Sequence, residues 1–255
     1  MSISEKSYRK ILFLLLSLLL AAPAAGGPAR TRNMPWEVGE KLTFAVRWGF
    51  ITGGHAHMEV REKIKLDGRD TYRIVTQARS APYFDPFYKV RDLVESYIDA
   101  QHLHSVRYEQ DLNEGNFSRQ LAIIYDHESG YAYENGERFE ITENIQDVLS
   151  SFYFLRTKEL EVGGRYTFDV GTSREVWPLE VTVEGRERIR VPAGRFDTLI
   201  VVPEIREEDG IFRKARGSLK IWVTDDERRI PVLMRCRIPI GSISAVLIEK
   251  ELPGL

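Results

Sequence analysis

The chain has 255 residues, of which 43% are hydrophobic, and its 36 basic and 38 acidic residues give a formal net charge of −2. This balanced charge argues against a nucleic-acid partner, because proteins that bind nucleic acid present a basic face. The single cysteine, Cys236, excludes an intramolecular disulfide, and its strand-like surroundings predict a buried or half-buried thiol. A chain of this length buries enough apolar area to form a core without disulfides.

The first 25 residues have the three-part pattern of a secretory signal peptide. Three basic residues begin it (Lys6, Arg9 and Lys10), an apolar run follows at 11–20, and the small-residue site Ala22-Pro23-Ala24 ends it. The apolar run is shorter than the roughly 20 residues that span a bilayer. We therefore predict a signal peptide over residues 1–25, with an uncleaved membrane anchor as the alternative.

Export would have consequences for the mature chain. No cysteine lies directly after the apolar run, so the lipid attachment site of a lipoprotein is missing. Removal of residues 1–25 takes away three basic residues and one acidic residue, which leaves 33 Lys+Arg, 37 Asp+Glu and a net charge of −4. No later segment is long and apolar enough to cross a membrane. We expect a soluble periplasmic protein that is not a lipoprotein and has no transmembrane segment after cleavage.

Alternation of apolar and polar residues dominates the rest of the chain. In the first such run, KLTFAVRW at 41–48, every second side chain is apolar and lies on one face, because side chains of a strand repeat every two residues. Turn signals separate the runs: Asp67-Gly68, Asn113-Glu114-Gly115, Glu128-Ser129-Gly130 and Asn135-Gly136. The pattern predicts a mainly β protein with a large curled antiparallel sheet, an open or partial barrel.

One segment breaks this rhythm, with apolar residues at helical spacing. NIQDVLSSFYFLRTK predicts an amphipathic helix near 144–158 that packs on the sheet, with Asn144 as the N-cap, Asp147 in the first turn and Lys158 at the end. It divides a single β-rich domain, 33–255, into an N-terminal half of about 36–141 and a C-terminal half of about 164–252.

Aromatic residues crowd one predicted loop, APYFDPFYKV, whose two prolines exclude a regular central strand. The loop either caps the core or forms an exposed apolar lip that contacts a ligand or partner. The candidate ligand-binding residues are therefore Tyr83, Phe84, Phe87 and Tyr88.

Histidines occur in two pairs at strand spacing, His55 with His57 and His102 with His104. A four-histidine metal site is conceivable if the two strands adjoin, but none of the spacings is an established metal motif. Paired histidines on a solvated strand face are the more common case. We therefore predict no metal ligand and no cofactor.

Acidic residues gather at two places, 207–209 and 225–227, each before a turn or strand. The second lies in IWVTDDERRIPVLM and predicts the polar tip of a hairpin, where exposed ion pairs contribute only ~0–1 kcal/mol. The strand before the tip places Trp222 opposite Leu219, Ile221 and Val223. No nucleophile elbow, zinc helix, phosphate loop or dinucleotide motif is present, so no catalytic residue is predicted and an enzyme is the less favoured class.

Four ordered motifs resemble the exported bacterial domain-of-unknown-function family numbered three-one-zero-eight. They are G-E-x-L-x-[FY]-x-[VI] at 39–46, D-x-L-S-x-x-Y-x-L-R at 147–156, P-A-G-x-F-D-T at 192–198 and the hairpin G-x-L-x-I-W…P-V at 217–232. In the second motif Phe152 and Phe154 flank Tyr153, an aromatic register that departs from other members. The resemblance implies an exported, mostly β envelope protein of undetermined biochemistry, and it brings no catalytic residues.

These observations leave three functional hypotheses. A curled sheet has a concave face that in small barrels holds an apolar ligand, which favours a non-catalytic binder of a lipid-like or apolar molecule. The first alternative is a protein-interaction or scaffold module of the envelope, whose exposed strand edges recruit a protein partner. The second is a metal-dependent enzyme that uses His55, His57, His102 or His104 with carboxylates.

Overall fold

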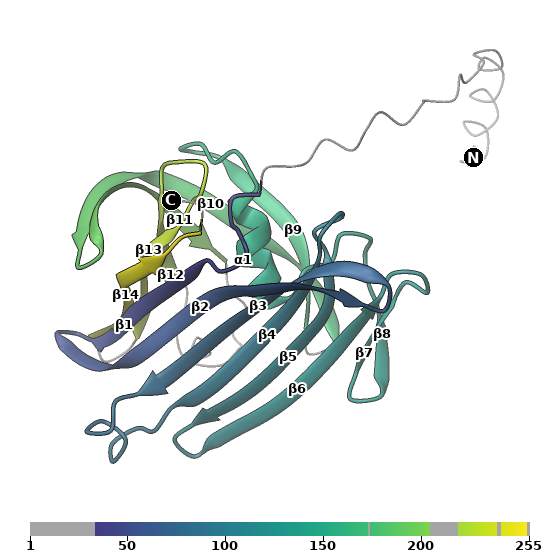
Figure 1. Ribbon diagram of the computed structural model, residues 1–255, viewed down its shortest axis with the longest axis horizontal. Coiled ribbons are helices and arrows are strands. Elements are labelled where there is room, and N and C mark those ends of the chain that lie inside the picture. Colours follow the sequence, from purple (N-terminus) through teal and green to yellow (C-terminus); the bar gives the residue numbers. More distant parts are fainter. Residues whose placement is uncertain (1–33, 173, 205–218, 239–240, 254–255) are drawn as a thin grey trace, which may run out of the picture. The chain divides into compact units, whose positions relative to one another are not determined.

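The computed structural model of the protein describes residues 34–172, 174–204, 219–238 and 241–253. The predicted signal peptide and the acidic run at 207–209 lie outside these residues. Apart from one helix, the regular elements of the described chain are all strands (Figure 1).

Fourteen strands and one helix make up this described part. In chain order they are β1 (Lys41–Trp48), β2 (Ile51–Leu66), β3 (Arg69–Ser80), β4 (Arg91–Asp99), β5 (Ser105–Glu114), β6 (Phe117–Asp126), β7 (Tyr131–Glu134), β8 (Glu137–Glu140), α1 (Val148–Arg156), β9 (Arg165–Thr172), β10 (Glu175–Val191), β11 (Gly194–Pro203), β12 (Leu219–Thr224), β13 (Pro231–Ile238) and β14 (Gly241–Glu251).

All fourteen strands belong to one antiparallel sheet in the order β8-β7-β6-β5-β4-β3-β2-β1-β14-β13-β12-β11-β10-β9. Nearly every strand pairs with its neighbours in sequence, and one long-range pairing, β1 with β14, joins the two halves. The edge strands β8 and β9 do not pair, so the sheet is open. The predicted fold class, a mainly β protein with a large antiparallel sheet and one helix, is confirmed.

The segment before the helix covers part of the β9 edge. Gln146 forms a parallel bridge with Val170, and its backbone N–H and C=O bond to Asp169 and Gly171 at 2.9 and 2.8 Å. The Tyr125 hydroxyl, from β6, donates to the Gly171 carbonyl at 2.6 Å. The open sheet is therefore bridged from β6 to β9 by side-chain and loop contacts.

The predicted alternation and turns are present in the structure. Leu42 and Phe44 are fully buried, whereas Trp48 at the end of the same strand is exposed. Asp67-Gly68 and Asn135-Gly136 occupy two-residue turns with positive φ at both positions, the conformation that matches the twist of a β-hairpin.

The helix is shorter than predicted, and its N-cap is Asp147 instead of Asn144. Gln146 pairs with Val170 of β9, so the helix cannot begin before Asp147. The Asp147 carboxylate accepts hydrogen bonds from the backbone N–H groups of Leu149 and Ser150, which the first turn leaves without intrahelical partners. The C-cap is Thr157, so Lys158 lies beyond the helix.

Two hydrophobic clusters form the core. The first joins the N-terminal strands to Trp222, and the second lies among β9–β13 and contains Ile221 and Val223. β12 is therefore buried on both faces. Cys236 is buried in the second cluster, as predicted, and burial raises the pKa of its thiol. Within the described chain, no helix combines the length and apolar character needed to span a bilayer.

Candidate functional site

The predicted aromatic loop, 81–90, joins β3 to β4 and contacts the tips of the hairpins on both sides. The Tyr83 hydroxyl donates to the Thr52 carbonyl, and the Phe84 ring lies 3.4 Å from the place where a Cβ on Gly53 would lie. On the other side, the backbone N–H of Gly115 donates to the Lys89 carbonyl at 2.7 Å. The loop therefore connects the β1–β2 tip to the β5–β6 tip.

An ion pair fixes the shape of this loop. Arg91 donates to both carboxylate oxygens of Asp85, at 2.6 and 3.2 Å, and the Ser80 hydroxyl donates to the same carboxylate. These hydrogen bonds, first from Arg91 and then from Ser80, lower the pKa of Asp85. The loop is held in one conformation by polar contacts beneath its aromatic surface.

Seven large apolar side chains are exposed on these tips and the adjoining strand ends, a surface named here the aromatic end. Phe50 is 95% exposed, Phe87 82% and Tyr83 63%. The full set is Trp48, Phe50, Ile51, Tyr83, Phe87, Tyr88 and Phe117. Of the four predicted ligand-binding residues, three thus face solvent, and Phe84 is half-buried and anchors the loop. Trp48, Phe50, Ile51 and Phe117 were not predicted, because only the pairing of β1–β6 brings their tips together.

The opposite end of the same strands is polar. The turns and loops that join β2 to β3, β4 to β5 and β6 to β7 surround a cleft of about 880 Å³. Charged and imidazole side chains line much of it, including Lys63, Arg69, Asp99, His102, His104 and His127. We call it the polar cleft.

A strained turn at the end of β4 brings a carboxylate and two histidines together in the polar cleft. Asp99 Oδ1 accepts hydrogen bonds from the backbone N–H groups of Gln101 and His102 at 2.8 and 2.7 Å, and Leu103 adopts a positive φ of 63°. Non-glycine residues seldom adopt this conformation. As a result, ligand atoms of Asp99, His102 and His104 all lie within 4.8 Å of one another.

The imidazole rings in this cluster are stacked. The ring centroids of His104 and His127 are 3.5 Å apart, and those of His102 and His104 are 5.4 Å apart. Burial, and then the nearby His127, lower the pKa of His104 to about 4, so its ring is neutral at pH 7. Burial alone would raise the pKa of Asp99, but the backbone hydrogen bonds and the histidines outweigh it and lower that pKa.

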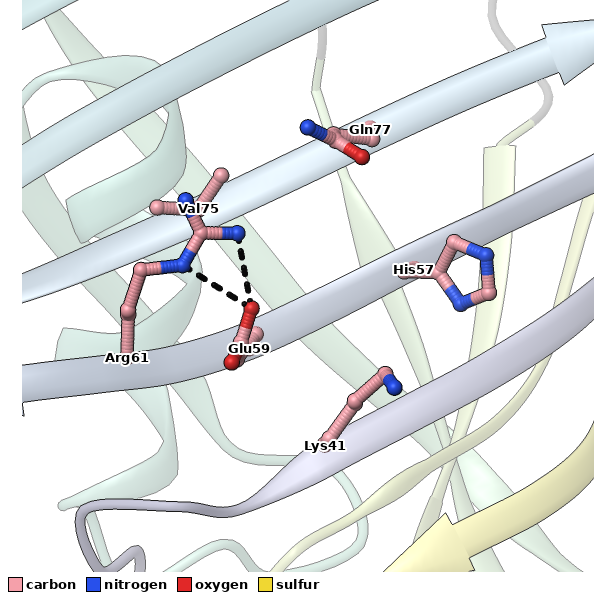
Figure 2. A pocket seen from close by; sticks show the side chains of 6 residues that line it. All are labelled: Lys41, His57, Glu59, Arg61, Val75 and Gln77. Atoms are coloured by element: carbon pink, nitrogen blue, oxygen red, sulfur yellow. Dashed lines mark hydrogen bonds and ion pairs between the residues drawn. The ribbon is translucent and has the colours of Figure 1, made fainter.

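His55 and His57 lie elsewhere, and Figure 2 shows the surroundings of His57 on β2. His57 borders a shallow groove of about 240 Å³ beside Lys41 and Gln77, and its Nδ1 lies 3.1 Å from the Thr43 hydroxyl. In the sheet, β3 lies between β2 and β4, the strand that leads into the turn with His102 and His104. The structure therefore does not assemble the conceivable four-histidine site, and it places His127 beside His104, which no spacing in the sequence indicated.

A buried polar network fixes α1 to the sheet. Asp147 Oδ2 accepts hydrogen bonds from the Ser96 and Ser105 hydroxyls at 2.6 and 2.7 Å, and all three residues are buried. Burial raises the pKa of Asp147, and the hydrogen bonds oppose this shift. No charged partner for this carboxylate is present in the described structure, so we assign it a structural role as helix cap and anchor.

The acidic hairpin tip also has a structural role. Asp225 pairs with Arg186 at 2.6 Å. Asp226 Oδ1 accepts hydrogen bonds from the Thr224 hydroxyl and from the backbone N–H groups of Arg228 and Arg229. Asp226 therefore closes its own turn and Asp225 pairs with β10, which agrees with the predicted polar hairpin tip.

Comparisons with known proteins identify a family and a fold. A family model described as "Protein of unknown function (DUF3108)" matches residues 43–248. Among solved structures, a beta-barrel-like protein of the family DUF1849 from Brucella abortus has a TM-score of 0.53 at 10% identity, and covers 85% of this chain and 98% of that chain. At this identity the likeness concerns the fold alone.

Two further solved structures are less similar. A DUF1089 family protein from Pseudomonas aeruginosa has a TM-score of 0.41 at 12% identity, with 75% of this chain and 92% of that chain covered. A protein with a YmcC-like fold from Bacteroides fragilis has a TM-score of 0.38 at 10% identity, with 86% and 98% covered. No curated protein matches the chain significantly.

Proposed function

Because the chain belongs to the DUF3108 family, whose function is unknown, we propose a function from its own surface: a non-catalytic protein of the cell envelope that binds lipid-like molecules through the aromatic end. The envelope location rests on the signal peptide predicted for residues 1–25.

The single observation that carries this proposal is the gathering of exposed apolar side chains. Twelve large hydrophobic side chains are exposed among the described residues, and seven of them lie on the aromatic end. Scattered exposed hydrophobic residues are ordinary, whereas a concentration on one patch is typical of an interaction surface. The Arg91–Asp85 ion pair and the hydrogen bond from Tyr83 to Thr52 hold the loop with Phe87 and Tyr83 at the surface.

The chemistry of the aromatic end matches a lipid surface. Tryptophan and tyrosine favour the level of the lipid headgroups, and phenylalanine and isoleucine favour the acyl region. Arg79 and Lys89 are exposed beside the loop and add positive charge that attracts anionic headgroups. Each phenylalanine side chain that becomes buried contributes about 1.5–3 kcal/mol to binding.

Co-sedimentation with vesicles of phosphatidylethanolamine and phosphatidylglycerol tests the proposal. We expect the protein to bind, and we expect the double variant Phe50→Ser/Phe87→Ser to bind at least about 100-fold more weakly, because it loses at least about 3 kcal/mol of apolar burial. The matched control is Ile124→Ser/Val162→Ser, which removes two side chains that are 49% and 46% exposed away from the aromatic end. This control should bind as the wild type does.

The proposal fails if the wild type does not bind the vesicles and organic extraction of the purified protein yields no lipid. Equal binding by the aromatic-end variant and the control variant would also contradict it, since the contact would then lie elsewhere.

The alternative, a protein partner recruited by a free strand edge, receives less support. The β9 edge is covered by Gln146 over Asp169–Gly171, and the other edge strand, β8, has only four residues, ERFE. Short, charged edges disfavour addition of another strand. An envelope protein partner stays a prediction, but the aromatic end is a better place for it than either edge.

A further inference from the structure

The turn at the end of β4 presents nitrogen and oxygen atoms whose ordinary partners are missing. His104 is buried, and its Nε2 has no hydrogen-bond partner among the described residues. Asp99 Oδ2 lies 4.0 Å from that nitrogen, which is beyond hydrogen-bond distance. Buried polar atoms are nearly always paired, so an orphaned ring nitrogen beside a carboxylate indicates that a ligand belongs between them.

Other contacts of Asp99 and His104 direct Asp99 Oδ2 and His104 Nε2 toward each other. Asp99 Oδ1 accepts hydrogen bonds from two backbone N–H groups and lies 3.2 Å from His102 Nδ1, which leaves Oδ2 for another partner. His104 also forms a backbone hydrogen bond with Glu143, which fixes its ring and leaves Nε2 toward Asp99. Histidines that bind metals usually bond through their second nitrogen in this manner.

We propose that Asp99, His102 and His104 bind a divalent transition-metal ion of the zinc class in the polar cleft. One carboxylate oxygen and two imidazole nitrogens form a ligand set that suits zinc and its neighbours and suits the hard cations Ca²⁺ and Mg²⁺ poorly. The ligand atoms already lie within 4.8 Å of one another. Tetrahedral coordination at about 2.0–2.1 Å places ligand atoms about 3.3 Å apart, so small side-chain movements complete the site.

The charges around the cleft are compatible with a cation at this position. Lys63 and Lys65 lie 3.9 and 3.6 Å from Asp70, and Arg69 pairs with Glu128 at 3.0 Å. These basic groups have their own carboxylates and do not compete for Asp99. Three protein ligands leave a fourth position toward the cleft for water or an external donor, as in open zinc sites.

His127 supports the site without belonging to the three-residue ligand group. Its Nε2 lies 2.8 Å from the Ser105 carbonyl, and its ring is nearly parallel to that of His104, with an angle of 11° between the planes. The stacked ring restricts rotation of His104 and keeps Nε2 directed at Asp99 Oδ2. We therefore assign His127 a positioning role.

Isothermal titration calorimetry on the full chain, after removal of metal with a chelator, tests this assignment with Zn²⁺ and Mg²⁺ salts. We expect one equivalent of Zn²⁺ to bind and Mg²⁺ to produce no comparable binding. Asp99→Asn keeps the oxygen that caps the turn and replaces Oδ2 with an amide that cannot bind the ion, so the fold should persist. This variant and His104→Gln should each weaken Zn²⁺ binding by at least about 10-fold.

The control is the double variant His55→Ala/His57→Ala, which removes two imidazoles outside the cleft and should bind as the wild type does. Circular dichroism melting of the metal-free proteins separates loss of metal from loss of fold. The inference is wrong if the wild type binds less than a stoichiometric amount of Zn²⁺. It is equally wrong if folded Asp99→Asn and His104→Gln bind Zn²⁺ as tightly as the wild type.

Discussion

The guanidinium of Arg156 and the carboxylate of Glu40 form a bidentate ion pair at 2.7 and 3.0 Å, with both side chains 1% exposed. Arg156 ends α1, and Glu40 precedes β1. The Arg156 guanidinium also donates to the carbonyls of Pro35 and Arg228. The Arg229 side chain donates to the Arg156 carbonyl. Three of the four motifs that carry the family resemblance therefore meet at one buried junction.

The first prediction concerns this ion pair. Removal of one partner leaves a buried charge unpaired, so Glu40→Leu and Arg156→Met should each lower the free energy of unfolding by about 3–5 kcal/mol. The double variant Glu40→Leu/Arg156→Met should lose much less than the sum, because neither charge remains buried. Urea denaturation of the four proteins measures the coupling. Additive losses would show that the two side chains act independently.

The second prediction concerns Trp222, which is 6% exposed and donates its indole N–H to Glu187 at 2.8 Å. Trp222→Ala should lower the free energy of unfolding by about 3–5 kcal/mol, because it leaves a cavity in the first core cluster. Thermal and urea unfolding measure this. A loss below about 1 kcal/mol would contradict the packing of this hairpin.

A third prediction separates shape from charge at the hairpin tip. Asp226→Asn keeps the Oδ1 acceptor of the turn and should change stability little, because the side chain is exposed. Asp226→Ala removes that acceptor and should lower the free energy of unfolding by about 1 kcal/mol or more. Equal changes in the free energy of unfolding for the two variants in urea denaturation would contradict a capping role for Asp226.

The fourth prediction is a pH dependence caused by Asp147. Burial raises its pKa above the ordinary value of 3.8, so between 3.8 and the raised value the folded state holds a proton that the unfolded state has released. The contribution of Asp147 to stability is therefore greatest below 3.8 and falls as the pH rises through that window. The variant Asp147→Asn has no carboxyl group to titrate at this position. The free energy of unfolding of the wild type should therefore fall relative to that of Asp147→Asn as the pH rises.

Unfolding free energies of the wild type and Asp147→Asn, measured across that pH range, show whether their difference falls or rises with pH. A wild type that instead gains stability over Asp147→Asn with rising pH would show that the hydrogen bonds from Ser96 and Ser105 outweigh burial.

The fifth prediction concerns the close approach of β2 and β3 beside the aromatic loop. A Cβ on Gly54 would lie 2.2 Å from the Arg79 carbonyl oxygen and 2.8 Å from the Ser80 Cα, both backbone atoms. Gly54→Ala should therefore lower the free energy of unfolding by about 1–3 kcal/mol. Gly185→Ala is the control, because no atom lies within 4 Å of its Cβ position. Equal melting temperatures for the two variants would contradict this account.

Much of the fold could be predicted because its signals are local. The alternation over 41–48 indicates a strand whichever strand it pairs with, and Asp67-Gly68 and Asn135-Gly136 favour hairpin turns through their own backbone preferences. The apolar spacing over 145–155 indicated a helix in the right place. Its first residue was wrong, because the bridge between Gln146 and Val170 competes with helix formation and depends on a strand that follows later in the chain.

The candidate sites also combine local features that the sequence showed with distant contacts that it did not show. The aromatic loop was evident from the sequence because its members are consecutive, and so was the spacing of His102 and His104. The sequence did not show that His127 lies beside His104 or that His55 and His57 lie outside the cluster. It also did not show that Phe50 and Phe117 lie near the aromatic loop.

The sequence by itself determined the strand and turn pattern, the closeness of His102 to His104 and the aromatic content of one loop, since these properties arise between near neighbours in the chain. Only the tertiary structure decided which strand ends share a surface, which ring stacks on His104 and which carboxylate Arg156 meets. Those contacts depend on the order and register of the sheet, and the order and register follow from the burial of side chains far apart in sequence.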